Sequence, residues 1–299
     1  MNIKNLLRPE YIFQPRMVLK RFSRALKKAG PTEVVTLPWG LPLKVRPSEV
    51  VGSVIWCYGL IDLVVAEAIA RLLDPGETAL DVGANIGQMT GLMALVSGPK
   101  GRVIAFEAHP VVAYELRENV NRWQNHGFQA KIEIQELAVS DAAGEVKFSS
   151  GKKWEENRGI AKVISSDSEG EGQVFTVPSV ALDDVLPSGS QVGLCKMDVE
   201  GHEDAVLRGC KRLLSERRIR DIAFEDLDYA NSKLPPIFHE YGYTIFSLHS
   251  DVMRPRLAPA QSDVQFLLRD GCNFIATLDP ERMKERFSKS GWRALRRWC

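Results

Sequence analysis

The sequence predicts an α/β protein built on an open sheet of mostly parallel strands. From Thr78 onward, short apolar stretches of strand type alternate with amphipathic stretches of helix type, which is the pattern of successive βαβ units. Several of these apolar stretches end in an acidic residue and run into a turn. The 299 residues suffice for one large domain with extensions, and 44% hydrophobic with 26% charged residues is typical of a globular chain. Together these observations indicate a Rossmann-like sheet.

An extension is predicted ahead of this sheet. Residues 14–29 have the spacing of a basic amphipathic helix. Residues 33–37 and 41–45 flank the sequence Pro38-Trp39-Gly40, which predicts a strand, a turn and a second strand.

The most apolar window of the chain, residues 54–73, contains Asp62, Glu67 and Arg71. Charges near the middle of a membrane-spanning helix are costly. The window therefore predicts a buried or amphipathic helix, which we place at residues 60–73, and no transmembrane segment.

The elements of the sheet region follow one another at short intervals. Strands are predicted at residues 78–82, 102–107, 131–139, 192–198, 219–224, 243–248 and 264–269, and helices at residues 88–96, 111–124 and 202–214. The last two strands are joined by a loop without helical signal, so we expect them to be antiparallel. The polar stretch of residues 149–172 has no periodicity and predicts an insertion or loop.

Charge is distributed unevenly along the chain. Residues 1–30 carry eight Lys or Arg against Glu10 alone, and residues 280–299 carry seven against two acids. These ends could bind the acidic body or an anionic surface, but we favour ordinary solvated helix faces. We divide the chain into an N-terminal helix and hairpin extension (1–50), a main domain (51–275) and a basic C-terminal helix (276–299).

The five cysteines are scattered and form neither a C-x-x-C pair nor a Cys/His cluster, so we expect no disulfide framework and no zinc site. Residues 1–30 lack the apolar stretch of a signal peptide. We therefore expect a cytoplasmic protein with reduced thiols.

The sharpest motif is Leu-Asp-Val-Gly-Ala-Asn-Ile-Gly at residues 80–87. It places Asp81 at the end of the first predicted strand and small residues in the turn that follows. Gly83 and Gly87 lack a Cβ, so the backbone can approach a ligand there, in the region where open α/β sheets bind ligands. The acid-led spacing differs from the G-x-G-x-x-G of dinucleotide sites. Asp81 suits an ammonium group, as in the methionine part of S-adenosylmethionine.

Glu107 ends the second predicted strand, within Phe-Glu-Ala-His-Pro at residues 106–110. A carboxylate in this position can accept two hydrogen bonds from ribose hydroxyls. An acid at a strand end is common, but Glu107 and Asp81 on adjacent strands together strengthen the prediction of a nucleoside site.

A third motif, Lys-Met-Asp-Val-Glu-Gly-His-Glu at residues 196–203, follows the fourth predicted strand. It brings Asp198, Glu200 and His202 to the same sheet edge as the glycine turn. Glu203 and the following acid could instead simply favour a helix N-terminus, with His202 a solvated first-turn residue. We expect Asp198 to point into the crevice.

The chain resembles the FkbM family of methyltransferases. The resemblance rests on the three motifs above, on Leu-Ala-Val-Ser-Asp at residues 137–141 and on Ser-Val-Ala-Leu-Asp-Asp at residues 179–184. It extends from about Gly59 to Arg269. It implies a class I methyltransferase fold, a seven-stranded sheet of order 3-2-1-4-5-7-6 with its last strand antiparallel. It further implies S-adenosylmethionine as cofactor and O-methylation of a hydroxyl, often on a sugar or natural product.

The resemblance also implies the residues that bind this cofactor. They are Asp81, Gly83, Ala84, Asn85 and Gly87 around the methionine moiety, Glu107 and Ala108 at the ribose, Ser140 and Asp141 near the adenine, and Asp198. The role of His109 is left open.

Methyl transfer to a hydroxyl also needs the hydroxyl proton to be removed by a nearby carboxylate or imidazole. Asp198 and His202 are the candidates, with Glu200 as an orienting group. A divalent cation at Asp198 would assist, but no second ligand cluster appears in the sequence, so we expect no metal. We expect a small-molecule acceptor and no nucleic acid. Two other functions stay open, a cofactor-binding module without catalysis and a nicotinamide-dependent oxidoreductase.

Overall fold

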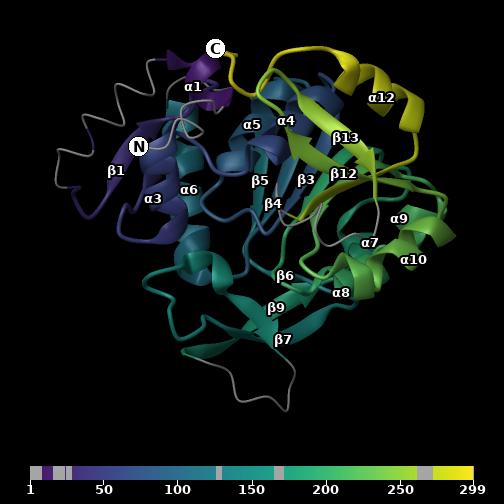
Figure 1. The fold of residues 1–299 in the computed structure, drawn as a ribbon. Coiled ribbons are helices and arrows are strands. Elements are labelled where there is room, and N and C mark those ends of the chain that lie inside the picture. The colour runs from purple at the N-terminus through teal and green to yellow at the C-terminus, as the bar shows by residue number, and fades with distance from the viewer. Residues whose placement is uncertain are drawn as a thin grey trace.

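An eight-stranded, mostly parallel sheet forms the centre of the protein (Figure 1). The computed structural model describes residues 9–15, 24, 29–125, 130–164, 172–260 and 272–298. In spatial order the strands are β5 (Lys131–Gln135), β4 (Arg102–Phe106), β3 (Thr78–Val82), β10 (Val192–Met197), β11 (Ile219–Glu225), β14 (Asn273–Thr277), β12 (Thr244–Ser250) and β13 (Pro255–Pro259). The strands from β5 to β11 are parallel, and β14 pairs antiparallel with both β11 and β12. The edge strand β13 brings the total to eight, where seven were expected.

Helices cover both faces of the sheet. The first face carries α3 (Val50–Tyr58), α4 (Leu63–Leu72), α5 (Gln88–Ser97), α6 (Pro110–Asn125) and α12 (Pro280–Ser288). The second carries α7 (Leu182–Val185), α8 (Glu203–Arg208), α9 (Lys211–Ser215) and α10 (Leu234–Glu240). Alternate residues of one strand therefore face different cores, as β3 shows: Ala79 packs in the first core and Leu80 in the second.

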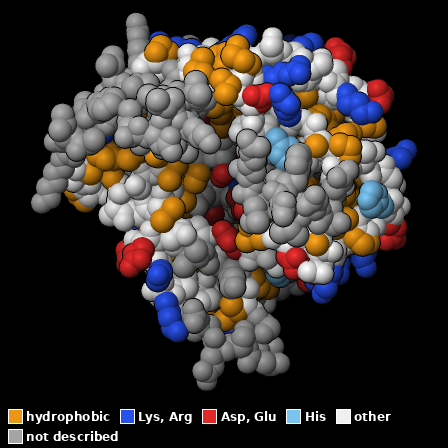
Figure 2. All heavy atoms as spheres, in the orientation of Figure 1, with side chains coloured by type: hydrophobic (Ala, Val, Ile, Leu, Met, Phe, Trp, Pro, Cys, Tyr) orange, Lys and Arg blue, Asp and Glu red, His pale blue; other side chains and the backbone are white. Residues whose placement is uncertain are grey.

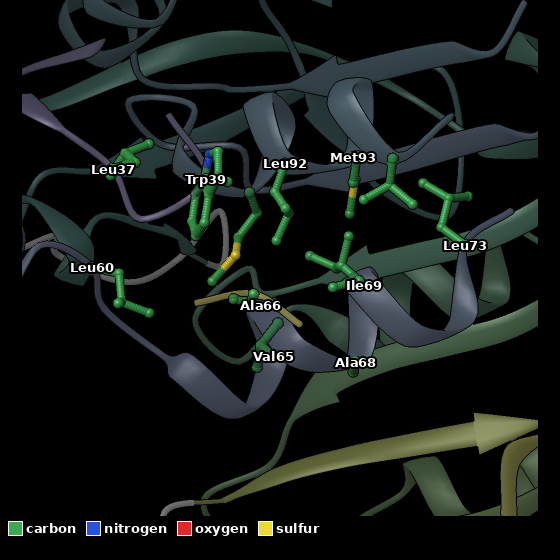
Figure 3. Close-up of a cluster of buried hydrophobic side chains, with 14 of the residues drawn as sticks. Leu37, Trp39, Leu60, Val65, Ala66, Ala68, Ile69, Leu73, Leu92 and Met93 are labelled. Carbon is green, nitrogen blue, oxygen red and sulfur yellow. The ribbon is translucent and has the colours of Figure 1, made fainter. Parts of the chain in front are cut away.

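Helix α4 is buried on all sides, and its apolar residues pack against α5 and the Trp39 turn (Figure 3). It also holds a fully buried ion pair, Arg71 Nε to Glu67 Oε1 at 2.6 Å. Both members bind the C-terminal segment: Arg71 donates to Gly291 O at 2.6 Å, and Glu67 accepts from Ala294 N at 2.7 Å. The pair is thus fully hydrogen-bonded, which offsets the cost of burying two charges.

The basic C-terminal end is held against acids of the main domain. Arg282 contacts Asp74 at 2.8 Å and Asp221 at 3.1 Å, and Arg286 contacts Asp74 at 2.8 Å. Of the roles considered for this end, the structure shows attachment to the acidic body rather than a freely solvated helix face. Strand β14 also crosses residue 275, the boundary expected for the main domain.

The N-terminal hairpin is present as predicted, with β1 (Glu33–Thr36) antiparallel to β2 (Pro42–Val45). A short helix that the sequence did not predict, α1, spans Pro9–Phe13. The basic helix expected at residues 14–29 lies largely outside the described residues.

The helix predicted at residues 60–73 is α4, and a second helix, α3, precedes it. The two are separated at Gly59, which ends α3 in the left-handed conformation (φ 87°), and they are bent by 73°. In the described part of the chain, no single helix is long and apolar enough to cross a membrane, although α3 and α4 together pass that test by length and composition.

A second, four-stranded sheet was missed by the sequence analysis. Its order is β6 (Ala138–Val139), β9 (Val174–Val180), β7 (Gly144–Ser149) and β8 (Lys162–Ile164), and it projects away from the main sheet (Figure 1). The strand predicted over residues 131–139 is therefore divided between two sheets, and the stretch predicted as a loop at residues 149–172 contains β8. Among the described residues of the small sheet, the buried apolar side chains are Ala138, Val139, Phe148 and Val177, so its hydrophobic pattern is too sparse to read as strands.

One further prediction was wrong in detail, and another is not tested. The helix expected at residues 202–214 is two short helices, α8 and α9, which meet at Gly209 and Cys210. The final strand expected at residues 264–269 lies outside the described residues, and β14 supplies the antiparallel strand between β11 and β12.

Candidate active site

A cavity of about 370 Å³ opens over the carboxyl ends of β3, β4, β10 and β11. This volume lies within the range of about 300–1,000 Å³ that is usual for small-molecule sites. The second sheet and the segments around α3 and α4 complete its walls. Figure 2 shows a hollow in this face of the molecule with acidic side chains inside it. Eight predicted site residues line the cavity: Gly83, Ala84, Asn85, Glu107, Ala108, Asp198, Glu200 and His202.

The glycine turn after β3 is shaped by contacts within the protein. Gly83 is left-handed (φ 77°), and a Cβ on it would lie 1.9 Å from the carbonyl oxygen of Asp198. A Cβ on Gly87 would lie 2.6 Å from Leu116 Cδ1, and Gly87 does not line the cavity. Each of these glycines therefore makes room for a neighbouring part of the chain, and the expectation that they also let a ligand approach stays a prediction.

Asp81 does not line the cavity. Strand alternation places its side chain on the α5 face of the sheet, where it is fully buried and accepts a hydrogen bond from Thr90 Oγ1 at 2.6 Å. The cation beside it belongs to the protein: Lys196 Nζ lies 3.7 Å from Asp81 Oδ1. Burial raises the pKa of Asp81, while Lys196 and Thr90 oppose that rise.

Lys196 is a functional residue to which sequence reasoning gave no role. Its ammonium donates to Gly83 O at 2.8 Å and lies 3.2 Å from Asp198 Oδ2. Burial alone would lower the pKa of Lys196, but Asp198 and Asp81 outweigh burial and hold the pKa above its usual value. The charged ammonium therefore ties the glycine turn to the end of β10.

Glu107 lines the cavity at the end of β4 and is almost fully buried. Its carboxylate accepts hydrogen bonds from the backbone N–H groups of Asn85 and His109, each at 2.9 Å. Burial raises the pKa of Glu107 to about 7, against the opposing effect of these two bonds. Each carboxylate oxygen keeps a lone pair for a further donor such as a ribose hydroxyl.

His202, Ser140 and Asp141 form one group beside the cavity. His202 Nε2 lies 3.0 Å from Ser140 Oγ, and Ser140 Oγ donates to Asp141 Oδ1 at 3.2 Å. Burial lowers the pKa of His202, so the imidazole is neutral near pH 7. Of these three residues, only His202 lines the cavity. Asp141 turns outward and lies 3.5 Å from Arg208.

Two more carboxylates line the cavity, and the sequence analysis missed both. Glu225 ends β11, and Asp62 precedes α4 in the left-handed conformation (φ 52°). Burial, with Asp198 and Asp62 nearby, raises the pKa of Glu225 to about 7. Burial, followed by the charge of Asp198, raises the pKa of Asp62. The rule that strand-end acids face the crevice would have found Glu225, but no sequence signal marks Asp62.

An aromatic stack joins the end of β4 to the segment between β7 and β8. The His109 ring stacks on Trp154, with centroids 3.7 Å apart, and the Arg158 guanidinium carbon lies 5.1 Å from the centroid of the Trp154 ring. Arg158 also pairs with Glu115 of α6 at 2.9 Å. Burial, followed by the nearby Arg158 charge, lowers the pKa of His109 to about 4. His109 thus serves as a neutral stacking partner that joins the second sheet to the end of β4.

The residues of the cavity fit S-adenosylmethionine. The cofactor carries a sulfonium and an ammonium group, and the carboxylates Asp62, Glu107, Asp198 and Glu225 surround the space with negative charge. Apolar side chains at Phe106, Leu137, Val139 and Met197 suit an adenine ring. Within the described ranges, no group of three or more His, Cys, Asp or Glu side chains is arranged to hold a metal ion.

A mostly parallel sheet with a glycine turn after its first strand, an acid after its second and a cavity above both belongs to an S-adenosylmethionine-dependent methyltransferase. Sequence comparison gives the family within that class. Residues 81–245, more than half of the chain, match the Methyltransferase FkbM domain. The chain belongs to this family.

Two named sequence relatives agree with this assignment. The chain is 29% identical to the 2-O-methyltransferase NoeI of Sinorhizobium fredii, over 58% of this chain and 74% of that protein. It is also 29% identical to the 31-O-demethyl-FK506 methyltransferase FkbM of Streptomyces tacrolimicus, over 58% of this chain and 75% of that protein. A solved methyltransferase FkbM from Methylobacillus flagellatus is similar at 18% identity with a TM-score of 0.43. That match covers 71% of this chain and half of the solved one.

Proposed function

We propose that this protein transfers a methyl group from S-adenosylmethionine to a hydroxyl of a sugar or natural-product-like small molecule in a cytoplasmic setting. The observation that carries the proposal is the division of the cavity into two halves. One half, over β3 and β4, has Glu107 and the glycine turn, and the other, over β11 and β14, has carboxylate and amide side chains. When bound, the cofactor supplies an electrophilic methyl group.

The first half suits the cofactor. Glu107 is positioned by two backbone hydrogen bonds, so its free lone pairs are preorganised to accept ribose hydroxyls. Lys196 fixes the turn at Gly83 and so the floor on which the methionine moiety would rest. His202 and Ser140 hold each other beside the apolar residues that suit the adenine ring.

The second half suits an acceptor with several hydroxyl groups. Asp62, Glu225 and Asn273 line it, and their oxygens and amide can accept or donate hydrogen bonds to hydroxyls. Asp198 lies between the two halves, with its carboxylate 3.2 Å from the Lys196 ammonium. We assign to Asp198 the role of orienting the acceptor. Bringing a hydroxyl oxygen to about 3 Å from the methyl carbon, in line with the breaking bond, supplies much of the rate enhancement.

The relatives support the same chemistry without fixing the acceptor. The names of NoeI and FkbM describe O-methyltransferases, the second acting on a natural product. We infer hydroxyl methylation for this chain from that similarity and from the oxygen-rich acceptor half.

Incubation with methyl-radiolabelled S-adenosylmethionine tests the proposal. Methyl glycosides and polyhydroxylated macrolides serve as acceptors, and simple carboxylic acids as the comparison. We expect label in an alkali-stable product, because methyl ethers resist alkali and methyl esters do not. Label only in alkali-labile products, or none with any hydroxyl acceptor, would contradict it.

A further inference from the structure

We propose that Glu225 is the general base that takes the proton of the acceptor hydroxyl, and that Asp198, held by Lys196, only orients the acceptor. This inference rests on the proposed function. It assigns the proton transfer to a residue on a different strand from the one that the sequence motif indicates.

Strand order places Glu225 beside the reacting region. Met197 of β10 pairs with Phe224 of β11, so the next residues, Asp198 and Glu225, lie at adjacent strand ends. The next strand on the other side ends at the glycine turn, where Asp198 N donates to Val82 O. With strands about 4.8 Å apart, Glu225 lies about 5 Å from the end of β10 and about 10 Å from the turn. It is therefore on the acceptor side of the cavity.

The two carboxylates differ in their partners. Asp198 forms an ion pair with Lys196, and transfer of a proton to Asp198 would take one of the two acidic partners from a buried lysine. The Glu225 carboxylate makes no hydrogen bond or ion pair with any residue that the structure describes, although it is half-buried. A half-buried carboxylate without a partner is costly, and such groups are typical of functional sites.

The charges around Glu225 are mainly acidic. The acids that act on it are Asp198 after β10, Asp62 before α4 and Glu203 of α8, while Lys196 of β10 opposes them. Cys272, before β14, is the other titratable group coupled to Glu225. Burial and these acids raise the pKa of Glu225 to about 7. A base with a pKa near the working pH is both deprotonated and able to hold a proton, which is the condition for efficient general-base catalysis.

The hydroxyl proton passes to a Glu225 carboxylate oxygen while the hydroxyl oxygen bonds to the methyl carbon. The electron pair of the broken carbon–sulfur bond stays on sulfur, and Glu225 then releases the proton to water. No oxidant, reductant or metal takes part in this step.

An infrared titration of the protein without cofactor tests the assignment without an acceptor. Carboxyl bands of the wild type are followed from pH 5 to 9 and compared with those of Glu225→Gln and Glu107→Gln. We expect each variant to lose one carboxyl that titrates near pH 7. A Glu225 carboxyl that is fully ionised below pH 6 would overturn the proposal, whatever acceptor the enzyme uses.

Kinetics with an acceptor from the radiolabel assay provide the second test. We expect Glu225→Gln to lower kcat by about 10²-fold or more, with cofactor Kd within threefold of wild type and without the rise of kcat through pH 7. Glu240→Gln, at an exposed acid of α10, is the matched control and should behave as wild type.

The kinetic outcomes separate the two carboxylates. Wild-type kcat in Glu225→Gln together with a 10²-fold loss in Asp198→Asn would assign the base to Asp198 and overturn the proposal. If wild-type protein methylates no hydroxyl acceptor, the proposed function fails, and the infrared titration still decides whether Glu225 has the ionisation that a base requires.

Discussion

Lys196 and Asp81 face each other as paired residues of β10 and β3, with Nζ and Oδ1 3.7 Å apart in the interior of the sheet. The acid of the glycine-turn motif is thus neutralised from within the protein. The same ammonium reaches Gly83 O and Asp198. One buried cation therefore joins two motifs that lie more than a hundred residues apart in the sequence.

Lys196→Met should strongly destabilise the protein. It leaves the buried carboxylate of Asp81 without its cation, and removal of one partner of a buried pair costs about 3–5 kcal/mol. Urea unfolding measures the loss. Lys131→Met is the matched control, because Lys131 is exposed and its pair with Glu133 should be worth less than about 1 kcal/mol.

The double variant Asp81→Asn/Lys196→Met separates charge from packing. It should recover part of the stability lost in Lys196→Met, because no buried charge is then unpaired. Equal stability of the two variants would show that Asp81 does not depend on Lys196.

Gly83→Ala should lower the free energy of unfolding by more than the strain of placing an alanine in a left-handed conformation. The added Cβ would lie 1.9 Å from Asp198 O, so the end of β10 must move. Gly76→Ala is a matched control, because Gly76 has φ 87° and open space within 4 Å of its Cβ position. Gly76→Ala should lower the free energy of unfolding only by this conformational strain, about 1–2 kcal/mol.

We expect Gly83→Ala to lose more unfolding free energy than Gly76→Ala, and to weaken cofactor binding at least tenfold, which Gly76→Ala should leave unchanged. Thermal unfolding and calorimetry measure the two effects. Equal losses in the two variants would mean that the contact of Gly83 with Asp198 is unimportant.

Strand β3 and its residue Asp81 show what can and cannot be predicted from the sequence. The bounds of β3 were predicted to the residue, since a short apolar run between Gly76 and the glycine turn leaves little choice. That strand's alternation would also have turned Asp81 away from the cavity, but the motif's association with ligands suggested the opposite. An acid at a strand end followed by glycines does not by itself indicate which face of the sheet a helix covers.

The role of Glu225 depends on strand order rather than on local pattern. Residues 198 and 225 become neighbours because β10 and β11 pair in parallel, and a motif search along the chain does not show this. The small sheet was missed for a different reason. Its strands have few buried side chains, so the period of two that marks a strand is weak there.

The pKa of His109 should respond to Trp154. In the wild type it lies near 4 because burial excludes water and Arg158 is close. Trp154→Ala opens one face of the ring to solvent, so the pKa should rise toward 6.5, while Trp154→Phe should keep most of the depression. NMR titration of the imidazole measures this, and an unchanged pKa in Trp154→Ala would contradict the stacking role.

The lowered pKa of His109 also predicts how its contribution to stability changes with pH. Because the folded-state pKa of His109 is below the unfolded value of 6.5, its contribution is fully present above pH 6.5 and is lost as the pH falls toward 4. Because Glu107 and Glu225 titrate in the same window in both proteins, the readout is the difference in unfolding free energy between the wild type and Trp154→Ala, which should narrow by on the order of 1–3 kcal/mol as the pH falls from 6.5 toward 4. Urea unfolding at several pH values measures it.

Calorimetric titration tests most directly whether the cavity over β3, β4 and β10 binds S-adenosylmethionine through Glu107. We expect the wild type to bind above pH 7 and to bind more weakly as the pH falls through 7, because a protonated Glu107 accepts fewer hydrogen bonds.

Glu107→Ala should bind about 30- to 150-fold more weakly at pH 8, since two charge-assisted hydrogen bonds are worth about 2–3 kcal/mol. Glu145→Ala, at an exposed acid of β7, should bind as wild type. Circular dichroism checks that both variants are folded. A folded Glu107→Ala protein that binds the cofactor within threefold of wild type would contradict the account.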